Sequence, residues 1–205
     1  MFRRLRLQFI TIASLAILFI LVFTVGIINT VRSFQTEQEI SKVLNTLTEN
    51  NGSFGKTKKI ETNQGHEIPS DSFRFFSVTL SGDKVVSQDT SHTSLIDDEE
   101  AVSYALAASR MTNTLGTIRE KNINLSYQVS KVRKNKILVV FLDTTSYYNS
   151  SQALLSLSIL LSMFGFIFFV VIVSALSGIV IRPFIRNYEK QRRFITNASH
   201  ELKTP

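Results

Sequence analysis

Two long stretches without a charged residue dominate the pattern of apolar and polar positions along the chain. Residues 7–31 contain 25 residues without a charge, and residues 144–181 contain 38. From Ala153 onward the second stretch consists almost wholly of Leu, Ile, Val, Phe and small residues. Because about 20 apolar residues cross a bilayer as a helix, we predict one transmembrane helix over residues 7–31 and a second over residues 153–181.

The first stretch has one alternative interpretation, a cleaved signal peptide, because Arg3, Arg4 and Arg6 form a positively charged N-terminal region. Its apolar part is longer than that of a signal peptide, and no small-x-small cleavage site follows before Phe34. We therefore interpret it as an uncleaved membrane anchor.

The region between the two stretches begins with a helical pattern. Apolar residues recur at i, i+3, i+4 and i+7, namely Ile40, Val43, Leu44 and Leu47. They predict a helix over residues 31–49 that continues out of the membrane and ends at Asn50-Asn51-Gly52. Residues 53–71 are polar and are expected to be the least ordered part. Strands are predicted over 73–80 and 84–88, joined by a turn at 81–83.

Four consecutive acidic residues, 97–100, open the next predicted element. One interpretation is a site for a divalent cation or a cationic peptide. We favour a helix start, in which Asp97 caps the helix and Glu100 completes a capping box. Apolar and small residues follow at helical spacing (Val102, Ala105, Leu106 and Ser109), and Gly116 is the predicted stop.

Two further strands complete this region. Leu125, Tyr127 and Val129 alternate with polar residues, and residues 137–142, after a turn at Lys134-Asn135, are continuously apolar, as in a central strand. The order of elements is similar to that of extracellular PAS-like sensor folds. The chain has no cysteine, so this domain is held by its core alone, and the isolated His66 and His92 do not suggest a metal site.

The charge distribution predicts the topology. The net charge of +7 would suggest a nucleic-acid partner if it were spread over the chain, but residues 32–152 hold 14 Lys/Arg and 14 Asp/Glu. The excess lies in residues 1–6, with three Arg, and in residues 182–205, with six Lys/Arg against two Glu. Positive flanks mark the cytoplasmic side. We predict cytoplasmic termini, an extracellular domain over 32–152, and no nucleic-acid binding.

The last twelve residues, FITNASHELKTP, place one histidine in a setting suited to phosphoryl transfer. A neutral imidazole can attack a phosphate if its second nitrogen is hydrogen-bonded to an acceptor, which the neighbouring Glu201 can supply. Thr204 follows His200 by four residues, one turn along the same helix face. The segment resembles the phosphoacceptor motif (H-box) of bacterial sensor histidine kinases. That resemblance implies His200 as phosphoacceptor, Glu201 as activating base and Thr204 in dephosphorylation.

The connection to this motif is short, since 17 residues separate Arg182 from His200. A HAMP signalling module of the kinase family does not fit there. Residues at alternating intervals of four and three, the spacing of a coiled-coil or bundle seam, are Phe184, Tyr188, Gln191, Ile195, Ala198 and Leu202. This seam leaves His200 on the outer side of the helix.

Together these patterns predict an α+β membrane protein. Two transmembrane helices flank an extracellular PAS-like mixed α/β sensor domain, and residues 182–205 begin a cytoplasmic dimerisation and phosphoacceptor bundle. The resemblance implies the bacterial plasma membrane, a homodimer, an extracellular signal and a response regulator as partner. No nucleotide motif occurs, so we expect this chain to bind no cofactor, with ATP and Mg used by the full-length protein. The alternative is a non-catalytic two-span receptor that modulates a full-length kinase.

Overall fold

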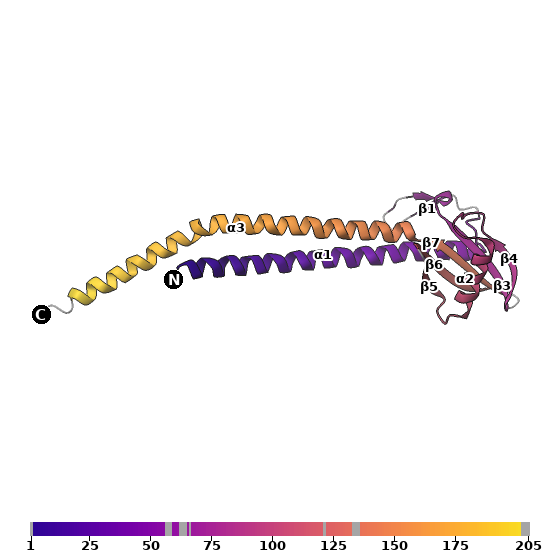
Figure 1. Ribbon diagram of the computed structural model, residues 1–205, viewed down its shortest axis with the longest axis horizontal. Coiled ribbons are helices and arrows are strands. Elements are labelled where there is room, and N and C mark those ends of the chain that lie inside the picture. The colour runs from indigo at the N-terminus through magenta and orange to yellow at the C-terminus, as the bar shows by residue number, and fades with distance from the viewer. Residues whose placement is uncertain are drawn as a thin grey trace. The chain divides into compact units, whose positions relative to one another are not determined.

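The computed structural model describes residues 2–55, 59–61, 65, 67–120, 122–132 and 136–201. The chain forms two compact units (Figure 1). One combines Met1–Asn29 with Leu154–Pro205, and the other is Thr30–Ala153.

The two charge-free stretches lie in two long helices, α1 (Phe2–Glu49) and α3 (Thr145–Glu201). Both helices are long enough and apolar enough to cross a membrane. Large apolar side chains face outward along them; Phe19 and Leu161, for example, are each 71% exposed. Such continuous apolar surface on a helix suits a lipid environment. As predicted, the first helix continues past residue 31 without a break and ends at Glu49, where Asn51 and Gly52 adopt positive φ.

An antiparallel five-stranded sheet forms the centre of the Thr30–Ala153 unit. Its strands are β3 (Phe75–Ser81), β4 (Lys84–Asp89), β5 (Leu115–Glu120), β6 (Ile123–Val132) and β7 (Lys136–Asp143), in the order β4-β3-β7-β6-β5. β7 lies in the middle, as its uninterrupted apolar sequence predicted. Its residues alternate between two buried faces, with Leu138, Val140 and Leu142 on one and Val139 and Phe141 on the other.

A helix covers each face of this sheet, so the domain has two apolar cores. The predicted stripe of α1, Ile40, Val43, Leu44 and Leu47, is buried against the first face. Helix α2 (Asp98–Arg110) packs on the second face through Ala101, Ala105 and Ala108. There the Phe76 and Phe141 rings stack with their centroids 4.6 Å apart. Of the predicted stripe Val102, Ala105, Leu106 and Ser109, only Ala105 is fully buried, and the other three are partly buried. The three alanines lie deepest because a helix face without bulky side chains fits closely over these aromatic rings.

The prediction for the end of α2 was wrong. The helix ends at Arg110, and Gly116 lies in β5, a strand that the sequence patterns did not predict. A Cβ at Gly116 would be 2.6 Å from Cζ of Tyr127 on the neighbouring strand. Glycine is required there because an aromatic side chain crosses the backbone. Asp97 does precede the helix, but the predicted cap by its side chain was wrong, since that side chain makes no capping hydrogen bond. The Asp97 carbonyl accepts only the ordinary first helical hydrogen bond, from the Ala101 N–H.

The polar stretch 53–71 also contains more structure than predicted. It includes the short paired strands β1 (Lys59–Glu61) and β2 (Glu67–Pro69) and the 3-10 turn η1 (Ser70–Ser72). Phe54 and Ile60 anchor this stretch in the core beneath α1. Burial of these two apolar residues holds the stretch against the core. Their spacing follows no helix or strand period, so the sequence pattern did not predict it. The predicted turn at Lys134-Asn135 lies outside the described residues.

Gly52 gives a stability prediction, because its φ is +88° and an added Cβ would overlap Ser77 Oγ and lie 2.6 Å from Ser77 Cβ. We expect Gly52→Ala to lower the free energy of unfolding by about 2–4 kcal/mol, from backbone strain plus overpacking. Gly82 is the matched control, since its φ is also positive, at +63°, but no atom lies within 4 Å of the added Cβ. Gly82→Ala should cost about 1 kcal/mol. Chemical denaturation of the full chain in detergent, followed by circular dichroism, compares the two; equal losses would contradict the overlap.

Candidate functional site

Helix α3 joins the sheet domain to the H-box without an interruption. It begins at Thr145, two residues after β7, and runs to Glu201, so that the backbone of His200 is helical. The side chains of His200 and Glu201 are not described, and Leu202–Pro205, with Thr204, lie outside the described residues. The structure therefore places the predicted phosphoacceptor on the helix and leaves its contacts with Glu201 and Thr204 as predictions.

Pro183 lies inside α3, in the connection between the apolar stretch and the H-box. A proline within a helix removes one backbone donor and commonly bends the axis. Figure 1 shows α3 bending between its orange and yellow parts. The helical assignment nevertheless continues on both sides of Pro183.

The predicted seam of α3 is described in part. Tyr188 is 50% exposed and Gln191 is also exposed, whereas the side chains of Phe184, Ile195 and Ala198 are not described. Of the seam positions whose side chains are described, Tyr188 and Gln191 are thus both exposed to solvent. The packing partner expected for a seam stays a prediction.

Arg6, near the N-terminal end of α1, is hydrogen-bonded to two residues of α3; these contacts are called the Arg6 clasp. Its Nε donates to Ser177 Oγ at 2.8 Å, and its guanidinium also donates to the Ser174 carbonyl at 2.8 Å. Ser177 is fully buried, and its hydroxyl donates to the same carbonyl. Sequence reasoning assigned Arg6 only a topological role. This clasp brings the basic N-terminal end of α1 next to the part of α3 that precedes Arg182, so the two basic flanks share one end of this unit.

Among the other histidines and acids considered as sites, His92 and Asp98 make contacts within the β-sheet domain. The His92 ring stacks on Phe75 with centroids 4.4 Å apart. Nearby, the Ser91 hydroxyl and backbone N–H both donate to Asp89, and these hydrogen bonds lower the pKa of that carboxyl. Asp98 accepts a hydrogen bond from Thr90. Within the described ranges, no group of three His, Cys, Asp or Glu is placed to hold a metal ion; His66 lies outside them.

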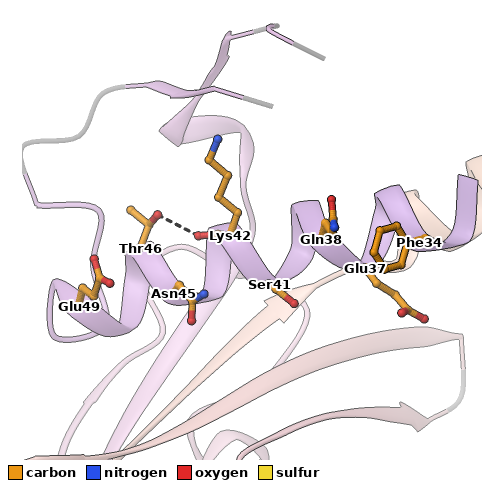
Figure 2. A pocket seen from close by; sticks show the side chains of 8 residues that line it. All are labelled: Phe34, Glu37, Gln38, Ser41, Lys42, Asn45, Thr46 and Glu49. Carbon is orange, nitrogen blue, oxygen red and sulfur yellow. Dashed lines mark hydrogen bonds between the residues drawn. The ribbon is translucent and has the colours of Figure 1, made fainter. Parts of the chain in front are cut away.

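Sequence reasoning did not reveal two hollows in the Thr30–Ala153 unit. One is a groove along a single face of α1, shown in Figure 2, with the lining residues Phe34, Glu37, Gln38, Ser41, Lys42, Asn45, Thr46 and Glu49. All eight come from one helix, and the Thr46 hydroxyl donates to the Lys42 carbonyl within it. The second hollow lies between α1 and α3 and brings charged and hydroxyl side chains together.

No protein-family model, no curated protein and no solved structure matches this chain. The class of protein is therefore defined by the fold alone. It is an α+β protein in which two long apolar helices, each able to cross a membrane, precede and follow a β-sheet domain.

Proposed function

We propose that this chain is the input part of a bacterial sensor histidine kinase in a two-component system, with His200 as the phosphoacceptor. The H-box carries this proposal, because all of its fixed positions are filled, from Phe194 through Ser199-His200-Glu201-Leu202 to Pro205. An isolated histidine would carry no such weight.

The arrangement of the helices supports this proposal. The domain over residues 32–152 would lie outside the cell as a PAS-like sensor, an assignment supported by its element order and five-stranded antiparallel sheet. The Arg6 clasp supports cytoplasmic placement of both basic flanks, because it joins them at one end of the helix pair. Since α3 is continuous from Thr145 to Glu201, a displacement at the domain would reach His200 along one helix.

The proposed chemistry has two steps. One nitrogen of the neutral His200 imidazole attacks the γ-phosphorus of ATP; a P–N bond forms, the P–O bond to ADP breaks, and Glu201 accepts the proton from the other nitrogen. The phosphoryl group then passes to an aspartate of a response regulator. Mg neutralises the phosphate charge in such transfers. ATP and Mg would bind elsewhere in the full-length protein, and Thr204 would orient water for dephosphorylation.

A direct test is to complete the open reading frame beyond codon 205 and to incubate the purified product with γ-labelled ATP. We expect label on His200, located by mass spectrometry of the phosphorylated peptide. Label on a different residue would contradict the assigned acceptor. A stop codon directly after Pro205 would favour the non-catalytic receptor that modulates a full-length kinase.

The two-span topology gives a separate prediction. Reporter fusions at Asn50 and Asn135 should be active only as extracytoplasmic reporters, and fusions after Arg193 only as cytoplasmic ones. The physical reason is the cost of translocating the basic flanks, which hold all of the net charge of +7. Fusions at Asn135 and Arg193 that report the same side would contradict two spans.

A further inference from the structure

A cavity of about 310 Å³ lies between the ends of α1 and α3 that enter the sheet domain. This volume is at the lower end of the range for small-molecule sites. The lining residues are Arg32, Gln35, Thr36, Glu39, Ile68, Ser146, Tyr147, Ser150 and Ser151. Only Ile68 among them is aliphatic, so the cavity suits a polar ligand.

Its two charged residues have opposite signs. Arg32 and Glu39 are seven residues apart on α1, which is two turns along the same helix face and about 10 Å along the axis. The ion pairs among the described residues are Lys59–Glu67 and Arg110–Asp83, so Arg32 and Glu39 are not paired with each other. Glu39 is partly buried, and a partly buried carboxylate gains from a cationic partner. The cavity thus offers one end to an anion and the other to a cation.

Hydroxyl groups from both helices line the same cavity as these charges. Thr36 contributes one from α1, and Ser146, Tyr147, Ser150 and Ser151 contribute four from α3. Burial, and next the Glu39 carboxylate, raise the pKa of the Tyr147 hydroxyl. Tyr147 therefore stays protonated at neutral pH and can donate a hydrogen bond to a ligand oxygen.

The position of the cavity along the chain indicates where its ligand comes from. Arg32 is the first charged residue after the charge-free stretch 7–31, and Ser151 lies two residues before the predicted span 153–181. If both stretches span the bilayer, these residues lie at the level of the lipid headgroups, outside the hydrocarbon. Phospholipid headgroups are then the most concentrated ligands at this cavity.

We propose that this cavity binds a zwitterionic phosphoethanolamine group, with the phosphate on Arg32 and the protonated primary amine on Glu39. A guanidinium pairs with phosphate oxygens through parallel N–H donors, and the amine supplies three N–H donors for the carboxylate and hydroxyls. An anionic group without an amine leaves Glu39 unpaired. The group can come from phosphatidylethanolamine or from free phosphoethanolamine. A bound group contacts α1 and α3 together, so it stabilises one arrangement of their outer ends.

This inference rests on the proposed two-span topology, but its test does not require kinase activity. The full chain is placed in nanodiscs of phosphatidylcholine. This lipid serves as the background because its headgroup carries a quaternary ammonium group, which has no N–H to donate. Thermal unfolding is then followed by circular dichroism with added phosphatidylethanolamine, phosphatidylglycerol or soluble phosphoethanolamine. We expect phosphatidylethanolamine to raise the midpoint by about 3–5 °C and phosphatidylglycerol to raise it less. A rise with soluble phosphoethanolamine identifies a free ligand as a second source.

Two variants that each remove one charge test whether Arg32 binds the phosphate and Glu39 binds the amine. Arg32→Gln and Glu39→Gln should each weaken binding of the phosphoethanolamine group about tenfold or more, as for lost charge-assisted hydrogen bonds. Glu37→Gln is the matched control, because Glu37 lies on the same helix and lines the other groove. It should keep the full rise. A rise of equal size in the wild type and both cavity variants would overturn the proposal, as would no rise with either source. If the topology fusions fail while soluble phosphoethanolamine still binds, the site stands and the lipid source does not.

Discussion

Replacing His200 with glutamine, in the protein expressed with the reading frame beyond codon 205, should reduce the γ-phosphate incorporation expected from the proposed function to background, a loss of at least about a thousandfold. Glutamine keeps the size and polarity of the side chain but has no nucleophilic ring nitrogen, so no P–N bond can form. The measurement is label incorporation over time with γ-labelled ATP. His92→Gln is the control, because His92 stacks on Phe75 in the β-sheet domain and its replacement should leave labelling intact.

The neighbouring H-box variants separate the roles within the motif. Glu201→Ala should slow autophosphorylation by about 10²-fold or more, the usual contribution of a general base. Thr204→Ala should leave autophosphorylation near the wild-type rate and mainly impair dephosphorylation of the response regulator. Undiminished labelling of His200→Gln would place the acceptor elsewhere. Equal effects of Glu201→Ala and Thr204→Ala on both reactions would contradict the separate roles.

Inserting one residue after Arg186 should change kinase output sharply, in either direction. The insertion point lies within the unbroken helix α3, beyond the Arg6 contacts to Ser174 and Ser177. One added residue rotates everything downstream by about 100°, because a helix has 3.6 residues per turn. His200 and the predicted seam residues Ile195 and Ala198 then face a different direction relative to the apolar stretch. Output is measured as autophosphorylation of the completed protein in membranes.

Insertion of seven residues at the same place provides the control. Seven residues restore the coiled-coil phase to a first approximation, so output should recover largely while the helix becomes about 10 Å longer. Indifference to both insertions would mean that a flexible joint separates the domain from the H-box. Pro183 would then be the place to replace, and Pro183→Ala should restore the dependence on register.

Several features of the fold could be predicted because they depend on local periodicity. The stripe from Ile40 to Leu47 predicted the buried face of α1, and the alternation of Leu125, Tyr127 and Val129 predicted a half-buried strand. The apolar run at 137–142 predicted the central strand, which is buried on both faces. In each case the positions that are buried are the apolar positions of the sequence. The secondary structure can therefore be predicted from the order of apolar and polar residues. The H-box likewise depends on sequence, and its acceptor chemistry stays a prediction.

The remaining features depend on contacts between distant residues. As a glycine, Gly116 suited the end of a helix. In the structure it lies in β5 opposite Tyr127, whose side chain occupies the space that a Cβ at position 116 would need. The pairing of β1 and β2 depends on the burial of Phe54 and Ile60 in the core shared with α1. No periodic pattern of apolar residues in the sequence predicts this burial. The Arg6 clasp joins residues 171 positions apart, and the cavity with Arg32 and Glu39 exists only where α1 and α3 meet the domain. The sequence by itself determined the two long apolar helices and the core stripes, because each is encoded by neighbouring residues. Only the tertiary structure decided the clasp and the cavity, because their groups converge from separate helices.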